Sequence, residues 1–207
     1  MSLMMDLNQL AKDTASILYR LITKKLNNTS YTLLFSSIGH ALMHMFAAFY
    51  FVIVLTIEKE WNISYDQLIR LWTLGALLIG LGAIPFGWLS DRWSRSGTMT
   101  IMFIGMGLAS ILCGFSTSIS FLFISLSLLG LFCSIYHPVG IPWVINSANR
   151  QGRALGINGI FGGVGIGSGA FVAGTLTELL NWQLAFILPG FLSIIIGFIL
   201  IYLIFID

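Results

Sequence analysis

The longest stretch without charge sets what this chain can fold into. Between Ser96 and Asn149 the sequence contains no Asp, Glu, Lys or Arg. Over the whole chain 57% of the residues are hydrophobic and only 9% are charged, whereas a soluble domain has about 25% charged residues. A water-soluble fold of 207 residues cannot bury so much apolar surface. We therefore expect an all-α integral membrane protein.

Six apolar runs are long enough to cross a membrane as helices, since a span needs about 20 apolar residues. The runs do not alternate between apolar and polar residues, as the strands of a membrane barrel would. The hydroxyl-rich segment 115–120 separates the third run from the fourth, where no charge marks the boundary. The predicted spans are 31–57, 66–90, 97–116, 120–146, 154–178 and 183–206.

The basic residues indicate the orientation, because Lys and Arg concentrate on the cytoplasmic side of a membrane. With the N-terminus inside, eight basic residues fall on that side, and only Lys59 and Arg70 fall outside. We therefore expect a multi-pass protein of the inner (cytoplasmic) membrane with both termini in the cytoplasm. The eight residues are Lys12, Arg20, Lys24, Lys25, Arg92, Arg95, Arg150 and Arg153.

The first thirty residues do not have the pattern of a signal peptide. Their apolar residues recur at nearly helical spacing, with basic residues between them. This pattern predicts an amphipathic helix that lies on the cytoplasmic surface of the membrane, in contact with lipid. A frayed tail is the alternative. The chain then divides into a cytoplasmic segment, 1–30, and a six-helix transmembrane bundle, 31–207.

A compact group of charges joins the second and third predicted spans, in the sequence Gly-Trp-Leu-Ser-Asp-Arg-Trp-Ser-Arg at 87–95. It resembles the loop between helices 2 and 3 of the major facilitator superfamily of transporters, roughly G-x-L-[AS]-D-[RK]-x-G-R. One specified position departs, since Ser94 stands where the family usually has Gly. The resemblance implies that the chain forms one six-helix half of the major facilitator fold. It also implies a gating loop of Gly87, Asp91, Arg92 and Arg95; an ordinary loop that only sets topology is the alternative.

The fifth predicted span is rich in glycine, which lets two helix backbones approach closely. Four of its glycines resemble the superfamily's antiporter motif, roughly G-x8-G-x3-G-P-x2-G-G, although Ala170 replaces the proline and Ala173 replaces one glycine. These are Gly156, Gly165, Gly169 and Gly174. The pattern is typical of a tight helix interface, and the resemblance adds antiport as a second interpretation.

All three histidines of the chain fall within predicted spans. His40 and His44 are four residues apart and so share one face of a helix, while His137 follows Tyr136 in the fourth span. Ionisable groups inside a membrane are costly and are candidates for function. Neither span has an acidic or basic residue in its core.

Three interpretations of the histidines remain open. They could couple transport to protons or hydrogen-bond a solute together with Tyr136, or they could be structural. They could also hold a transition metal, because two histidines four apart on a helix can chelate. Against the metal, no carboxylate or thiolate is clearly placed to complete a site.

The resemblance also bears on these histidines, because helices 1 and 4 line the central cavity of the superfamily. It implies that His40, His44 and His137 share one water-filled space. The Tyr-His-Pro cluster at 136–138 is similar to the fosmidomycin-resistance-like branch, which is associated with export of drugs and small polar molecules. Drug/proton antiporters often carry an Arg four residues before a Gly on helix 4. Here Leu126 precedes Gly130, so His137 becomes the candidate proton carrier.

Transport is therefore the expected function: proton-coupled export, by an antiporter, of a small organic solute or drug. The superfamily has two six-helix halves. The chain would then need a second half, a homodimer mate or another membrane subunit as its partner, and we favour a truncated or separately encoded N-terminal half. A non-transporting subunit and a metal-ion transporter that uses the histidines are the alternatives. No enzyme motif occurs, and we expect no cofactor and no nucleic-acid partner.

Overall fold

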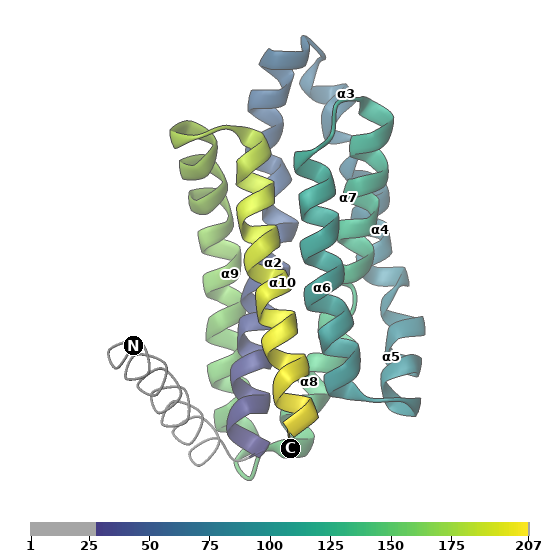
Figure 1. Ribbon diagram of the computed structural model, residues 1–207, viewed down its shortest axis with the longest axis vertical. Helices are drawn as coiled ribbons and strands as arrows, with labels where there is room; N and C mark the ends of the chain where they lie inside the picture. The colour runs from purple at the N-terminus through teal and green to yellow at the C-terminus, as the bar shows by residue number, and fades with distance from the viewer. Residues whose placement is uncertain (1–27, 207) are drawn as a thin grey trace, which may run out of the picture.

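The six predicted spans form a single bundle of helices in the computed structural model, which describes residues 28–206 (Figure 1). Each span is long and apolar enough to cross a membrane. The predicted surface helix lies outside the described residues except for positions 28–30, which begin the first span. The helices are α2 (Asn28–Trp61), α3 (Tyr65–Ile69), α4 (Trp72–Leu81), α5 (Ala83–Arg92), α6 (Arg95–Gly114), α7 (Ile119–Cys133), α8 (Tyr136–Ser147), α9 (Gln151–Leu179) and α10 (Trp182–Ile206).

The first span is longer than its apolar run. The run ends at Ile57, but α2 continues through a charged turn to Trp61. It stops at Asn62, whose backbone φ of 51° is left-handed, a conformation that asparagine tolerates and that commonly ends helices. Hydropathy thus locates the membrane-facing part of this helix, whereas backbone hydrogen bonding sets its length.

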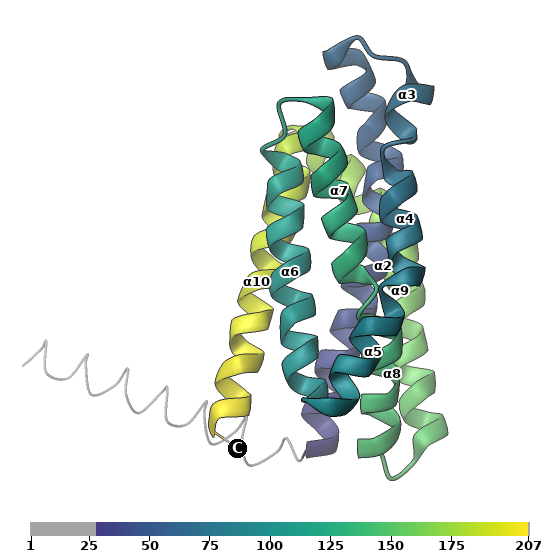
Figure 2. The ribbon, with the colours of Figure 1, turned by 90° about the vertical axis from the view of Figure 1, so that its right-hand side faces the viewer.

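Two spans are interrupted near their middle, as Figure 2 shows for α4–α5 and α7–α8. In the fourth span the break falls at Ser134–Ile135. Pro138 has no N–H to bond the carbonyl of Ser134 four residues earlier, and its ring crowds that carbonyl. The bend in this span therefore lies before Pro138, while α8 continues through Pro142.

The helix α2 occupies the middle of the bundle. It contacts α9 along much of its length and also touches α6, α7, α8 and α10. The helices α6 and α10 pack against each other as a second long pair, and α4 packs against α7. Large side chains fill the core where α2 meets α6 and α10, including the fully buried rings of Phe46, Phe49, Phe103 and Phe186. Side chains on α2 can thus reach several other helices.

The turns of the bundle separate the basic residues into two groups. The start of α2, the α5–α6 turn, the α8–α9 turn and the end of α10 all lie at one end (Figure 1). Arg92, Arg95 and Arg150 belong to these turns, whereas Lys59 and Arg70 belong to the opposite end. The folded chain therefore keeps the charge asymmetry on which the predicted orientation depends.

Candidate functional site

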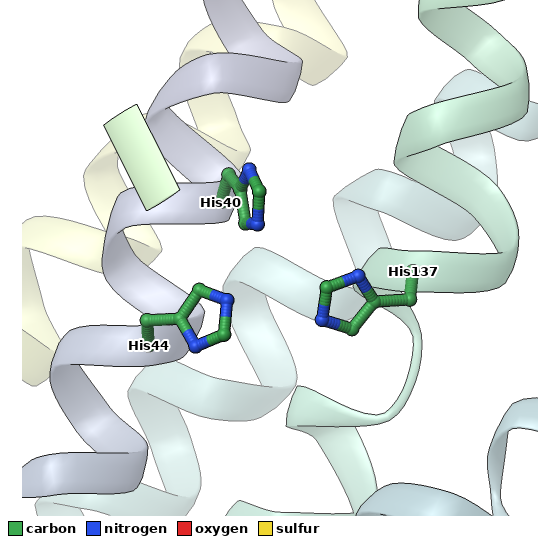
Figure 3. A group of neighbouring side chains, drawn as sticks. All are labelled: His40, His44 and His137. Atoms are coloured by element: carbon green, nitrogen blue, oxygen red, sulfur yellow. The ribbon is translucent and has the colours of Figure 1, made fainter. Parts of the chain in front are cut away.

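The three histidines meet near the middle of α2. His40 and His44 are one turn apart on that helix, and His137 lies in the first turn of α8, directly after the break in the fourth span. Figure 3 shows the three rings turned toward one space. The ring centroids are 4.9 Å apart for His40 and His44, and 5.5 Å apart from each of these to His137. The break before Pro138 starts α8 at the height of α2 where the other two histidines lie.

His40 is held on the side away from the other two histidines. Its Nδ1 lies 2.9 Å from the backbone oxygen of Asn158 on α9 and 3.0 Å from the side-chain Oδ1 of the same residue. A carbonyl oxygen only accepts hydrogen bonds, so Nδ1 carries the hydrogen. In the neutral ring the lone pair is then on Nε2. The ring also stacks on Tyr136, with centroids 4.4 Å apart and an interplanar angle of 17°.

A network of buried hydrogen bonds connects to His40 through Asn158. The Tyr136 hydroxyl donates to Oδ1 of Asn158 at 2.8 Å, and Nδ2 of Asn158 donates to Oγ of Ser36 at 3.2 Å. Ser36 in turn donates to the backbone oxygen of Gly140 at 3.0 Å. All three side chains are buried. The network links α2, α8 and α9, so it fixes the position of His40 relative to both neighbouring helices.

The sequence pattern does not mark Ser36 or Asn158 as site residues. A single serine in an apolar helix is common and does not indicate a functional site. Asn158 is more informative, because an amide is an unusual residue within an apolar span and needs a hydrogen-bond partner there. Its partners His40, Ser36 and Tyr136 lie 118, 122 and 22 residues away along the chain, and only the fold identifies them.

Gly162 on α9 leaves room for the His40 ring because it has no side chain. A Cβ atom at this position would lie 2.5 Å from Cε1 of His40 and 2.6 Å from Nε2, much closer than carbon and nitrogen atoms can approach. The imidazole therefore rests directly against the backbone of α9. Gly162 lies outside the four glycines that match the antiporter motif, and the sequence pattern alone did not separate it from its neighbours.

The four motif glycines have unequal surroundings. Side chains at Gly165 and Gly169 would collide with the backbone at Ala41 and with Ala48 on α2, respectively. Gly174 makes only ordinary contact, 3.7 Å from Val52, and Gly156 has nothing within 4 Å. Close packing of α9 against α2 thus depends on Gly165 and Gly169, which follow Gly162 by about one and two helical turns.

The open side of the cluster faces away from this bundle. His44 is half-buried and His137 is exposed. Within residues 28–206 neither ring makes a hydrogen bond, and no acidic or basic side chain lies in the cores of α2, α8 and α9. The site therefore presents imidazole nitrogens without fixed charge to whatever lies across this face.

The predicted gating residues lie elsewhere, at the α5–α6 end of the bundle. An Arg95 guanidinium nitrogen lies 3.2 Å from Oδ1 of Asp91, and the Asp91 side chain is two-thirds exposed at 67%. Arg92 lies over the Trp88 ring at 4.3 Å. Ser94, which replaces the family's glycine, accepts a hydrogen bond from the Gly97 N–H at 3.1 Å. The departure from the motif therefore provides an N-cap for α6.

The six long apolar helices define a multi-pass membrane protein. Residues 36–207 match the family model of the Major Facilitator Superfamily, and the chain belongs to this superfamily. The predicted six-helix half of the major facilitator fold is confirmed. The finer resemblance to the fosmidomycin-resistance-like branch stays a prediction.

Curated relatives match the chain over part of their length. The riboflavin transporter RibZ of Clostridioides difficile is 30% identical over 147 residues, covering 69% of this chain and 32% of the relative. The puromycin resistance protein pur8 of Streptomyces alboniger is 28% identical, covering 55% and 24%. The niacin transporter NiaP of Acinetobacter baylyi is 25% identical, covering 67% and 32%. The matches thus span about a quarter to a third of these relatives.

A solved structure shares the fold. It is a bacterial homolog of the human lysosomal transporter Spinster in an inward-facing and unoccupied conformation. The similarity has a TM-score of 0.76 at 18% identity and covers 85% of this chain and 43% of the other. At this identity the match shows the fold alone.

Proposed function

We propose that the chain is one half of a proton-coupled exporter of a small organic solute, with His40, His44 and His137 at the solute site. The observation that carries the proposal is the meeting of these three rings from two helices on an open face without fixed charge. Intramembrane ionisable groups mark solute or ion pathways. A second six-helix half, from a homodimer mate, another chain or a further part of the same protein, would close the site.

The named relatives suggest which solutes to try first. Riboflavin, niacin and puromycin are small molecules with aromatic nitrogen heterocycles, and imidazole rings stack on such groups and exchange hydrogen bonds with them. Tyr136 is fully buried behind His40. We therefore assign it to positioning His40 rather than to contact with the solute.

Protons are the proposed driving ion. Histidine has a reference pKa of about 6.5 and gains or loses charge in the physiological range. The titratable groups that meet here are the three histidines and Tyr136. Tyr50, further along α2, is buried elsewhere and donates to the backbone oxygen of Leu68. Two imidazolium rings at these separations would repel each other. The cluster is therefore suited to carrying one proton at a time.

The orientation completes the proposal. The basic residues at the α5–α6 and α8–α9 turns support a cytoplasmic position for that end of the bundle. We therefore propose a protein of the inner (cytoplasmic) membrane with both termini in the cytoplasm. The exposed Asp91–Arg95 pair then lies on the cytoplasmic side, where we propose that it gates access from that side.

Reconstituted vesicles provide the test. The chain is placed in liposomes with an imposed pH gradient, and movement of riboflavin, nicotinate and puromycin is measured with a pH-sensitive dye as a second readout. We expect one solute to move with counterflow of protons, and His137→Ala to abolish the coupled movement. Asn146→Ala, an exposed change further along α8, is the matched control and should keep it.

Two results would overturn the proposal. One is proton-driven solute movement that His137→Ala leaves unchanged from about pH 5.5 to about pH 8, the range around the reference pKa of histidine. The other is a monodisperse protein that binds none of the three solutes, alone or with a second half, which would favour a non-transporting subunit. Measuring the mass of the purified protein in detergent separates a dimer from a monomer.

A further inference from the structure

The histidine cluster has a geometry that solute binding alone does not require. One nitrogen from each of His40, His44 and His137 lies within 4.8 Å of the other two. Two ligands come from successive turns of α2, and the third comes from α8 across the space that Figure 3 shows between them. Spacing along the chain relates only the pair on α2, while the fold brings the His137 nitrogen within reach of both.

We propose that these three histidines bind a single divalent transition-metal ion of the Zn²⁺ type. Imidazole nitrogen is a preferred ligand of Zn²⁺ and of neighbouring metals, and three protein ligands with one open position are typical of reactive or exchangeable zinc sites. Ca²⁺ and Mg²⁺ prefer oxygen ligands, which the cluster does not offer. This proposal goes beyond the transport of an organic solute and does not depend on it.

The rings can reach the required distances with small rotations. Nitrogens bound to Zn²⁺ at 2.0–2.1 Å in a tetrahedron stand about 3.4 Å apart. The three histidine nitrogens lie within 4.8 Å of one another, so they must close by up to about 1.4 Å. His44 and His137 make no hydrogen bond within the described part of the chain. No bond to the protein therefore opposes their movement toward His40.

His40 is already oriented as a ligand. Its Nδ1–H donates to the backbone oxygen of Asn158 at 2.9 Å, so Nε2 holds the lone pair. Histidines that bind metals usually donate their other N–H to a carbonyl or carboxylate in this way, which fixes the tautomer and the ring plane. The stacked Tyr136 ring and the backbone at Gly162 hold the imidazole from both sides.

The fourth position faces the open side, next to the exposed His137. Water or a donor group of a bound solute would complete the tetrahedron there. A metal ion and a proton use the same nitrogen lone pairs, so they are alternative occupants of the cluster.

Cobalt titration of the purified chain tests the site without any transport measurement. The protein carries a purification tag without histidine and is kept in detergent. We expect one Co²⁺ per chain with the visible absorption of tetrahedral cobalt, and we expect Zn²⁺ to displace it. His44→Gln and His137→Gln should each lower the affinity at least tenfold. The double variant Cys113→Ser, Cys133→Ser removes the two buried thiols and should bind as the parent does.

A replacement ligand separates coordination from a structural role. His44→Cys should keep Co²⁺ bound and add a sulfur-to-cobalt charge-transfer band, which a histidine that only packs would not produce. His137 is exposed and without a hydrogen bond, so His137→Gln should remain folded, as judged by its elution as a single species. The proposal is wrong if cobalt binding is absent, or if it persists unchanged in both glutamine variants. Metal binding without solute transport would leave this site standing and remove only the proposed exporter.

Discussion

Two long helix pairs, α6 with α10 and α2 with α9, use glycine to pack closely but surround their polar groups differently. In the first pair a Cβ at Gly107 would lie 2.5 Å from the backbone oxygen of Gly190, so backbone meets backbone. The second pair has such a backbone contact too, where Gly165 meets Ala41, but there Gly162 also faces the ring of His40. Glycine thus brings two backbones together in both pairs, and in one of them it also makes room for an ionisable side chain.

The hydroxyl groups show the same contrast. Ser193 on α10 and Ser110 on α6 each donate to a backbone oxygen of the partner helix, at 2.7 Å. Their hydrogen bonds end there. Ser36 on α2 belongs instead to the network that leads through Asn158 to His40. The comparison teaches that the polar contacts of α6–α10 only join two helices, whereas those of α2–α9 also fix the position of the His40 ring.

The largest effect is expected at the backbone contact of the α6–α10 pair. Gly107→Val would force α6 away from α10, and overpacking of this kind costs about 1–3 kcal/mol or more. We expect a clear fall in the thermal unfolding midpoint measured in detergent. The same substitution at Gly167 on α9, whose Cβ would meet nothing within 4 Å, is the control. Equal falls for both variants would contradict the special role of the α6–α10 contact.

Gly162→Ala should separate function from stability. The added methyl group would displace the His40 ring, a movable side chain, rather than a backbone. We expect at least a tenfold loss of cobalt affinity and of proton-driven transport, with an unfolding midpoint near that of the parent. Gly163→Ala changes the next residue, where a Cβ meets nothing within 4 Å, and should leave binding intact. A loss confined to the midpoint would make Gly162 another packing glycine.

Much of this contrast could be predicted from the sequence, and part of it could not. The six spans follow from apolar runs, and the histidines stand out because few ionisable residues lie inside the spans. The glycine pattern indicates close packing but not the partner, so Gly162 looked like Gly163. The role of Asn158 depends on residues more than a hundred positions away. Pairing of distant segments is the information that a local pattern lacks.

The two serines offer a smaller, paired test. Ser193→Ala removes one buried hydrogen bond, worth about 0.5–1.5 kcal/mol, and should lower the unfolding midpoint without any change in cobalt affinity. Ser36→Ala removes a bond of similar strength but also frees the amide of Asn158. We expect a similar shift of the midpoint together with a measurable loss of affinity, read from the same titration. If both variants bind cobalt as the parent does, Ser36 does not help to position His40.

The smallest effect is expected at Gly156, the first glycine of the antiporter-like pattern. Its Cβ would meet nothing within 4 Å, so in the chain alone Gly156→Ala should leave the unfolding midpoint unchanged or raise it slightly, since alanine favours helix by up to about 1 kcal/mol over glycine. The open position also allows a test of the second half proposed above. Repeating the measurement with that half bound, and with Gly163→Ala as the comparison, asks whether it packs against the face of α9 that carries Gly156. A midpoint that falls only in the assembly would make Gly156 part of the interface, whereas a fall in the isolated chain would contradict the open surroundings of this residue.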